Sequence, residues 1–157
     1  MTYLITFACY GSRVHGEDSG SVDRIHNLPA DPKRAATERL QMQTPPFFMN
    51  SACRDVVLAA MRERCLLRGW RMVAAHVRTN YAHLVVEAEV RPERIMNDLK
   101  SFTSRCLNQA GRDAPNRKRW ARHGSTRWLW NPEHVAAAVR YVVHAQGEPM
   151  SVYEALE

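Results

Sequence analysis

The sequence predicts an α+β fold in which one antiparallel sheet carries helices, and the order of its apolar segments is the main reason. Runs rich in β-branched and aromatic residues predict strands over residues 2–10, 70–77 and 82–88. Apolar residues at spacings of three and four predict helices over residues 50–67 and 93–108. The order of strand, helix, strand, strand and helix is that of a ferredoxin-like sandwich.

Turn and capping residues set the expected ends of these elements. The first strand ends at Gly11, and a long loop over residues 11–46 follows, rich in Gly, Pro and polar residues, with a short helix expected around residues 35–42. Asn50 or Ser51 can cap the first long helix, which Gly69 closes. Pro92 suits the first turn of the second helix.

The last third of the chain predicts a linker, a short strand and a helix. Residues 111–124 form a polar and basic stretch, and residues 125–130 can form a short strand. Asn131 and Pro132 begin a helix that runs to about residue 145 and is closed by Gly147. We expect one domain over residues 1–157, with the 11–46 loop as an insertion. The sheet face that the other helices leave free is then available to nucleic acid or to this last helix.

Charge points to a polyanionic partner. The formal net charge is +6, because 22 Lys and Arg residues oppose 16 Asp and Glu residues, and a basic excess in a small domain is typical of nucleic-acid binding. A solvated surface with an ordinary basic excess is the alternative. Much of the charge is arginine, whose planar fork binds phosphate oxygens in pairs.

Other functional classes find little support. The four cysteines form no C-x-x-C pair, so a zinc ribbon is not indicated. The first residues lack a basic region followed by a long apolar run, so we expect no signal peptide, and no run approaches the roughly 20 apolar residues that span a bilayer. We therefore expect a cytoplasmic, reducing setting.

Two clusters of polar residues could carry chemistry. Tyr81 and His83 alternate along a predicted strand, so their side chains point to the same face. Tyr141 and His144 share one face of the last helix, and Gln146 follows at its end. Taken separately, the strand pair could simply face solvent, and Tyr141 could be an amphipathic part of the core.

Together with their surroundings, these clusters resemble a known family. The ordered set YLITFACYG, HVRTNYAHLVV, LKSFTSRCLN, WARHGSTRWLW and YVVHAQGEPM resembles the single-tyrosine transposases of the HUH superfamily, in their insertion-sequence-200-like and REP-associated branch. The resemblance covers nearly the whole chain. It implies binding of imperfect DNA hairpins with single-stranded flanks, a homodimer, and a divalent metal, Mg²⁺ or Mn²⁺.

The resemblance also implies roles for single residues. Tyr141 matches the nucleophile that attacks a DNA phosphate and leaves a 5′-phosphotyrosine and a free 3′-OH. His83 and Gln146 match metal ligands, with Tyr81 in place of the first metal-binding histidine and Gln146 five positions after Tyr141, where the family has four. His76 or His144 could substitute for the missing imidazole.

The missing histidine leaves two functional hypotheses open. The first is a metal-dependent transposase or nickase, in which the ion stabilises charge on the attacked phosphate. The second is a catalytically weakened or inactive derivative that binds nucleic-acid hairpins. A third hypothesis, an interaction module without nucleic acid, is disfavoured by the basic excess.

DNA contacts are expected from the basic residues of the second half of the chain. Trp120, Trp128 and Trp130 could stack on unpaired bases, although one or two of them could instead belong to the core. The candidates for direct contact with DNA are Lys100, Arg105, Arg117, Lys118, Arg119, Arg122, Arg127 and Trp128.

Overall fold

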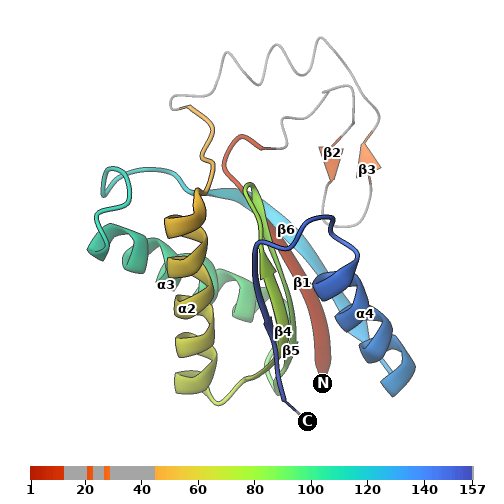
Figure 1. Ribbon diagram of the computed structural model, residues 1–157. Helices are drawn as coiled ribbons and strands as arrows, with labels where there is room; N and C mark the ends of the chain where they lie inside the picture. Colours follow the sequence, from red (N-terminus) through yellow and green to blue (C-terminus); the bar gives the residue numbers. More distant parts are fainter. Residues whose placement is uncertain (13–20, 23–26, 29–44, 157) are drawn as a thin grey trace.

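A five-stranded antiparallel sheet forms the centre of the molecule (Figure 1). We analysed a computed structural model, which describes residues 1–12, 21–22, 27–28 and 45–156. The strand order is β6-β1-β5-β4-β7. The strands are β1 (Thr2–Cys9), β4 (Arg71–Val77), β5 (Tyr81–Glu87), β6 (Trp120–Leu129) and β7 (Ser151–Glu154).

Helices cover both faces of this sheet. α2 (Ser51–Arg68) and α3 (Pro92–Gln109) lie side by side on one face, and α4 (Pro132–His144) lies on the other (Figure 1). The predicted α+β ferredoxin-like sandwich is therefore confirmed, with the last helix on the face that α2 and α3 leave free. In the described part of the chain, no helix is long and apolar enough to cross a membrane.

Alternation along the strands divides the apolar side chains between two clusters. Tyr3, Ile5 and Phe7 of β1 are at most 2% exposed and point toward α2 and α3, in the larger cluster. The smaller cluster joins α4 to the opposite face through residues that include Val85 and Val142, both fully buried. Full burial of one such side chain contributes roughly 1.5–3 kcal/mol, so both faces hold the sheet in place.

The predicted caps begin and end the helices. The Asn50 side chain accepts a 2.9 Å hydrogen bond from the amide of Cys53, and Gly69 closes α2 with a φ of 73°. Asn131 caps α4 in the same way, by accepting a 2.9 Å hydrogen bond from the amide of His134. Gly147 has a φ of 78°, but the helix already ends at His144.

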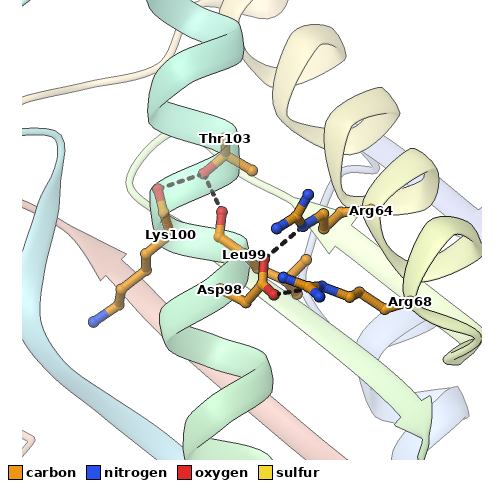
Figure 2. A network of polar contacts seen from close by, with 6 residues as sticks. All are labelled: Arg64, Arg68, Asp98, Leu99, Lys100 and Thr103. Carbon is orange, nitrogen blue, oxygen red and sulfur yellow. Dashed lines mark hydrogen bonds and ion pairs between the residues drawn. The ribbon is translucent and has the colours of Figure 1, made fainter.

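An ion-pair cluster fastens α2 to α3. Arg64 and Arg68 approach the two carboxylate oxygens of Asp98 at 2.6 and 2.9 Å (Figure 2). Farther along α3, the Thr103 hydroxyl donates to the carbonyl of Leu99 at 2.7 Å and accepts at 3.1 Å from the Trp120 indole of β6. α3 is thereby tied both to α2 and to the edge of the sheet.

Two strands differ from the sequence-based expectation. β6 begins at Trp120, so residues 120–124 belong to the sheet and not to the linker predicted there. Their charged and glycine-containing sequence hides the strand, which is recruited by pairing with β1. β7 was not predicted, because it has only four residues and depends on pairing with β4.

Most of the long loop lies outside the described residues. Within it, β2 (Ser21–Val22) and β3 (Asn27–Leu28) form a small antiparallel pair. The short helix expected around residues 35–42 falls outside the described residues.

Candidate active site

A row of polar residues crosses the sheet beneath α4. The strand register pairs Ser125 of β6 with Thr6 of β1, Thr6 with His83 of β5, and His83 with His76 of β4. Residues paired across an antiparallel sheet project to the same face, so the four side chains form one line. This line runs from one edge strand of the sheet to the strand next to the other edge.

His83 is the centre of this row. Its side chain is buried, at 5% exposure, and a 2.7 Å hydrogen bond joins its Nδ1 to the hydroxyl of Thr6. The ring of Tyr81 packs edge-on against it, with centroids 4.9 Å apart and planes at 76°. Thr6 and Tyr81 together fix where the imidazole lies and how it is turned.

Tyr141 lies on α4 above the same row. Its ring centroid is 5.8 Å from that of His83, and the two ring planes make an angle of 74°. Ala138 and Val142 of α4 are buried against Ala74 and Val85 of the sheet, and the small alanines let the helix approach closely. Tyr141 remains 46% exposed, so its phenol is both near His83 and open to a ligand.

His76 serves the fold and not the site. Its Nδ1 is 2.9 Å from the carbonyl oxygen of Val142, and its Nε2 accepts a 3.0 Å hydrogen bond from the amide of Met150. Burial lowers the pKa of His76, an effect that the hydrogen bond to Val142 opposes and the nearby Arg78 strengthens. With both ring nitrogens hydrogen-bonded within the fold, His76 presents no ring nitrogen to a metal ion, which argues against one of the two substitutions considered from the sequence.

The other candidate ligands lie at the end of α4. Gln146 donates a 3.2 Å hydrogen bond through Nε2 to the carbonyl of Tyr141, and His144 is exposed. Among the described residues, no group of three or more His, Cys, Asp or Glu side chains could hold a metal ion. One imidazole, one amide and one phenol do not fit Mg²⁺, which prefers carboxylate oxygens, and they are a sparse set for Mn²⁺.

Two of the predicted DNA contacts are used inside the protein. Arg119 is only 2% exposed, and its guanidinium donates to Asn108 Oδ1 at 2.7 Å and to the carbonyl of Arg112 at 2.6 Å. Lys100 donates to the carbonyls of Ala121 and His123 at 2.9 and 3.0 Å. Burial lowers the pKa of Lys100 to about 8. Both residues fasten α3 to the chain around β6. Burial keeps Arg119 from contacting a phosphate, whereas a DNA contact of the partly exposed Lys100 stays a prediction.

The remaining basic candidates are spread around the sheet. Arg105 is exposed on α3, where it lies 5.8 Å from the Phe102 ring, and the side chain of Arg117 is only 9% exposed beside Asp113. Lys118, Arg122 and Arg127 are exposed. Of these basic residues, only Arg127 lines a groove that lies beside Tyr141, between α4 and the strands β1 and β6.

Trp128 and Trp130 form an exposed aromatic pair at the end of β6. Their rings stack with centroids 5.2 Å apart and planes at 15°, and they are 39% and 69% exposed. Tyr3 packs edge-on against Trp128 at 4.9 Å. Trp120 lies on the same face of the sheet as Trp128, where it packs on Phe7 and borders the larger apolar cluster.

Comparison with sequence models of known protein families shows the family of this protein. The model described as IS200-like transposase matches residues 45–144, which is more than half of the 157 residues. The chain belongs to the IS200-like transposase family. The matched segment includes Tyr81, His83 and Tyr141, and it ends before Gln146.

The fold of this IS200-like transposase chain is similar to a solved structure of a REP-associated tyrosine transposase bound to a REP hairpin. The TM-score is 0.51 at 12% sequence identity, over 90% of this chain and 64% of that one. The chain thus spans about two thirds of the length of that relative. A search of curated protein sequences gives no match.

Sequence reasoning missed three polar residues near Tyr141. Thr6 and Ser125 meet only through strand pairing, and His134 approaches them only when α4 packs on the sheet. The alternation of Ser125 with Arg127 lay within the strand predicted over residues 125–130, but the sequence did not show that this strand pairs with β1 beside Thr6.

Proposed function

We propose that this chain binds single-stranded DNA hairpins and cleaves and rejoins the strand through Tyr141. The observation that carries the proposal is the 5.8 Å approach of the Tyr141 and His83 rings on the face of the sheet opposite α2 and α3. The family match supports a transposase, and the solved relative was bound to a REP hairpin.

The proposed reaction is a transesterification. The phenolic oxygen of Tyr141 attacks a backbone phosphorus, the bond from phosphorus to the 3′ oxygen breaks, and a 5′-phosphotyrosine forms. The phenol loses its proton and the departing 3′ oxygen gains one, so no redox partner is needed. The phosphodiester energy is kept in the phosphotyrosine, so that attack by a free 3′-OH rejoins DNA without ATP.

We infer that His83 acts on the reacting phosphate from the floor of the site. Its Nδ1 is held by Thr6, and its ring lies 5.8 Å from the ring of Tyr141. Because Tyr141 and His83 of one chain already meet, we propose a site formed in cis. We derive no step through a metal ion, since the donors present do not fit one.

A second candidate function follows from Tyr81. A tyrosine at the place of the first metal-binding histidine favours a derivative that binds hairpins without cleaving them. The exposed pair of Trp128 and Trp130 and the exposed basic residues support binding in either case.

Covalent trapping separates the two functions. The protein is incubated with labelled hairpins that carry single-stranded flanks from its own genomic neighbourhood, with Mn²⁺ or with EDTA, and resolved under denaturing conditions. Strand cleavage predicts a covalent adduct with the wild type and none with Tyr141→Phe. A Tyr81→His variant that reacts while the wild type only binds would instead support the non-cleaving derivative.

A further inference from the structure

A groove beside Tyr141 is lined partly by polar side chains, and Ser125, Arg127 and His134 among them have no role in the proposed reaction. It has a volume of about 380 Å³ and lies between α4 and the strands β1 and β6. Thr6, Ser125, Arg127 and His134 line it together with Tyr141. None of the described residues that line it is acidic.

Strand register and helix period bring these side chains together. Ser125 and Arg127 are two positions apart on β6, so their side chains project to the same face of the sheet. Their cross-strand partners on β1, Thr6 and Leu4, project to that face as well. His134 and Tyr141 are seven positions apart on α4, which is about two helical turns. Both therefore face β6 from above.

The groove carries a positive charge, that of Arg127, which is accessible to solvent. Arg127 is exposed, and within the described part of the chain no Asp or Glu forms an ion pair with it. A guanidinium presents a planar fork that matches two oxygens of a phosphate. The hydroxyl of Ser125 and the imidazole of His134 can donate further hydrogen bonds.

We propose that this groove binds one backbone phosphate of the DNA strand, with Arg127 as its cation and Ser125 and His134 as additional donors. The proposal rests on the function proposed above, because it places the bound phosphate beside Tyr141. Negative charge that develops on a phosphate during attack is stabilised by donors that are already in position. Arg127 supplies both such donors and a compensating positive charge from the protein itself.

The first test uses inorganic phosphate as the probe. Phosphate is titrated into ¹⁵N-labelled protein at constant ionic strength, and the amide signals of Ser125 and Arg127 are followed. We expect saturable shifts in the wild type, and their loss in Arg127→Gln. The matched control is Arg94→Gln, which removes the same charge from an exposed position on α3 and should keep the saturation.

Two outcomes would overturn the phosphate site. Shifts that fail to saturate in the wild type exclude specific binding, and equal saturation in wild type and Arg127→Gln excludes the assigned cation. If Arg127→Gln does not fold, as judged by its circular dichroism, Ser125→Ala takes its place and should weaken phosphate binding.

Hairpin DNA separates this inference from the proposed function. The slope of log affinity against log salt for a single-stranded flank should fall by about 0.7 in Arg127→Gln and stay unchanged in Arg94→Gln. Hairpin binding and adduct formation that are identical in wild type and Arg127→Gln would refute the groove while the proposed function stands. Saturable phosphate binding without any hairpin binding would refute the function while the groove stands.

Discussion

At the scale of single residues, Thr6 sets the orientation and the tautomer of the His83 imidazole. The 2.7 Å contact joins its hydroxyl to Nδ1, and β1 holds Thr6 between His83 and Ser125 in the sheet register. An imidazole whose one nitrogen is fixed by a hydrogen bond has a defined orientation and a preferred tautomer. Thr6 is thus a positioning residue in the proposed site.

A Thr6→Val variant tests this positioning role. Valine keeps the shape and removes the hydroxyl, so we expect slower adduct formation with hairpin affinity unchanged. The tautomer of His83, read from its ¹⁵N chemical shifts, should become mixed, and Thr6→Ser should restore it. A tautomer ratio equal to that of the wild type would contradict the assigned role.

His76 makes stability depend on pH. Burial lowers the pKa of His76 in the folded state. In mildly acidic solution the unfolded chain is therefore protonated at His76 while the folded chain is not. The free energy of unfolding should therefore fall as pH drops below about 6.5, with a slope of up to about 1.4 kcal/mol per pH unit from this group. Urea unfolding at several pH values should show a shallower slope in His76→Gln, and equal slopes would contradict this account.

At the scale of elements, β6 joins the site to the helices. Gly124 sits where β6 presses on β1, and a Cβ atom there would lie 2.5 Å from the carbonyl oxygen of Thr6 and 2.6 Å from Met96 Sδ. Lys100 of α3 holds the carbonyls of this same stretch. The close approach keeps Ser125 in register with Thr6.

Gly124→Ala should disturb this junction. We expect a loss of about 1–3 kcal/mol in the free energy of unfolding, because the Thr6 carbonyl is backbone and cannot move aside. Adding Met96→Ala should not rescue the variant, since it relieves only the contact with sulfur. Chemical unfolding of the single and double variants measures both effects. A single variant as stable as the wild type would show that the strands separate easily.

The same elements show how far the sequence could predict the fold. Residues 2–10 and the two long helices are strongly patterned, and the caps Asn50, Gly69 and Asn131 mark helix ends through local chemistry. β7 and the first half of β6 carry no comparable local pattern, because both form by pairing with a neighbouring strand. They could be found only once the sheet was assembled.

The candidate site divides in the same way. Tyr81 and His83 were predicted to share a face from strand alternation, and the structure places them in ring contact. The roles of Arg119 and His76 could not be predicted, because the sequence alone does not show whether an arginine or a histidine is buried. His76 meets the carbonyl of Val142, which is far away in the sequence, and Arg119 meets Asn108 and Arg112 only through the irregular turn after α3, so sequence spacing reveals neither set of partners.

At the scale of the whole molecule, the sheet has two unlike faces. The face toward α2 and α3 is filled by the large apolar cluster, and the face toward α4 combines a small cluster with the polar row that contains His83. A fold of this kind can present chemistry on one face without exposing its main core. We propose that the site is complete within one chain.

Mixing two inactive variants tests that completeness. Tyr141→Phe and His83→Ala each lack one member of the proposed site, and a cis arrangement predicts that their mixture forms no adduct after subunits have had time to exchange. The mass in solution, measured by sedimentation, establishes whether the chains associate at all. Recovery of activity in a mixture of associated chains would show that Tyr141 serves a partner's site.

The most direct measurement of the central claim is the identity of the residue that DNA modifies. The wild type is reacted with hairpin DNA under the conditions of the trapping experiment, digested, and its nucleotide-bearing peptide sequenced by mass spectrometry. The account predicts a phosphotyrosine linkage on Tyr141, in the α4 peptide beside His83. A linkage on another tyrosine, or hairpin binding with no linked tyrosine at any position, would contradict it.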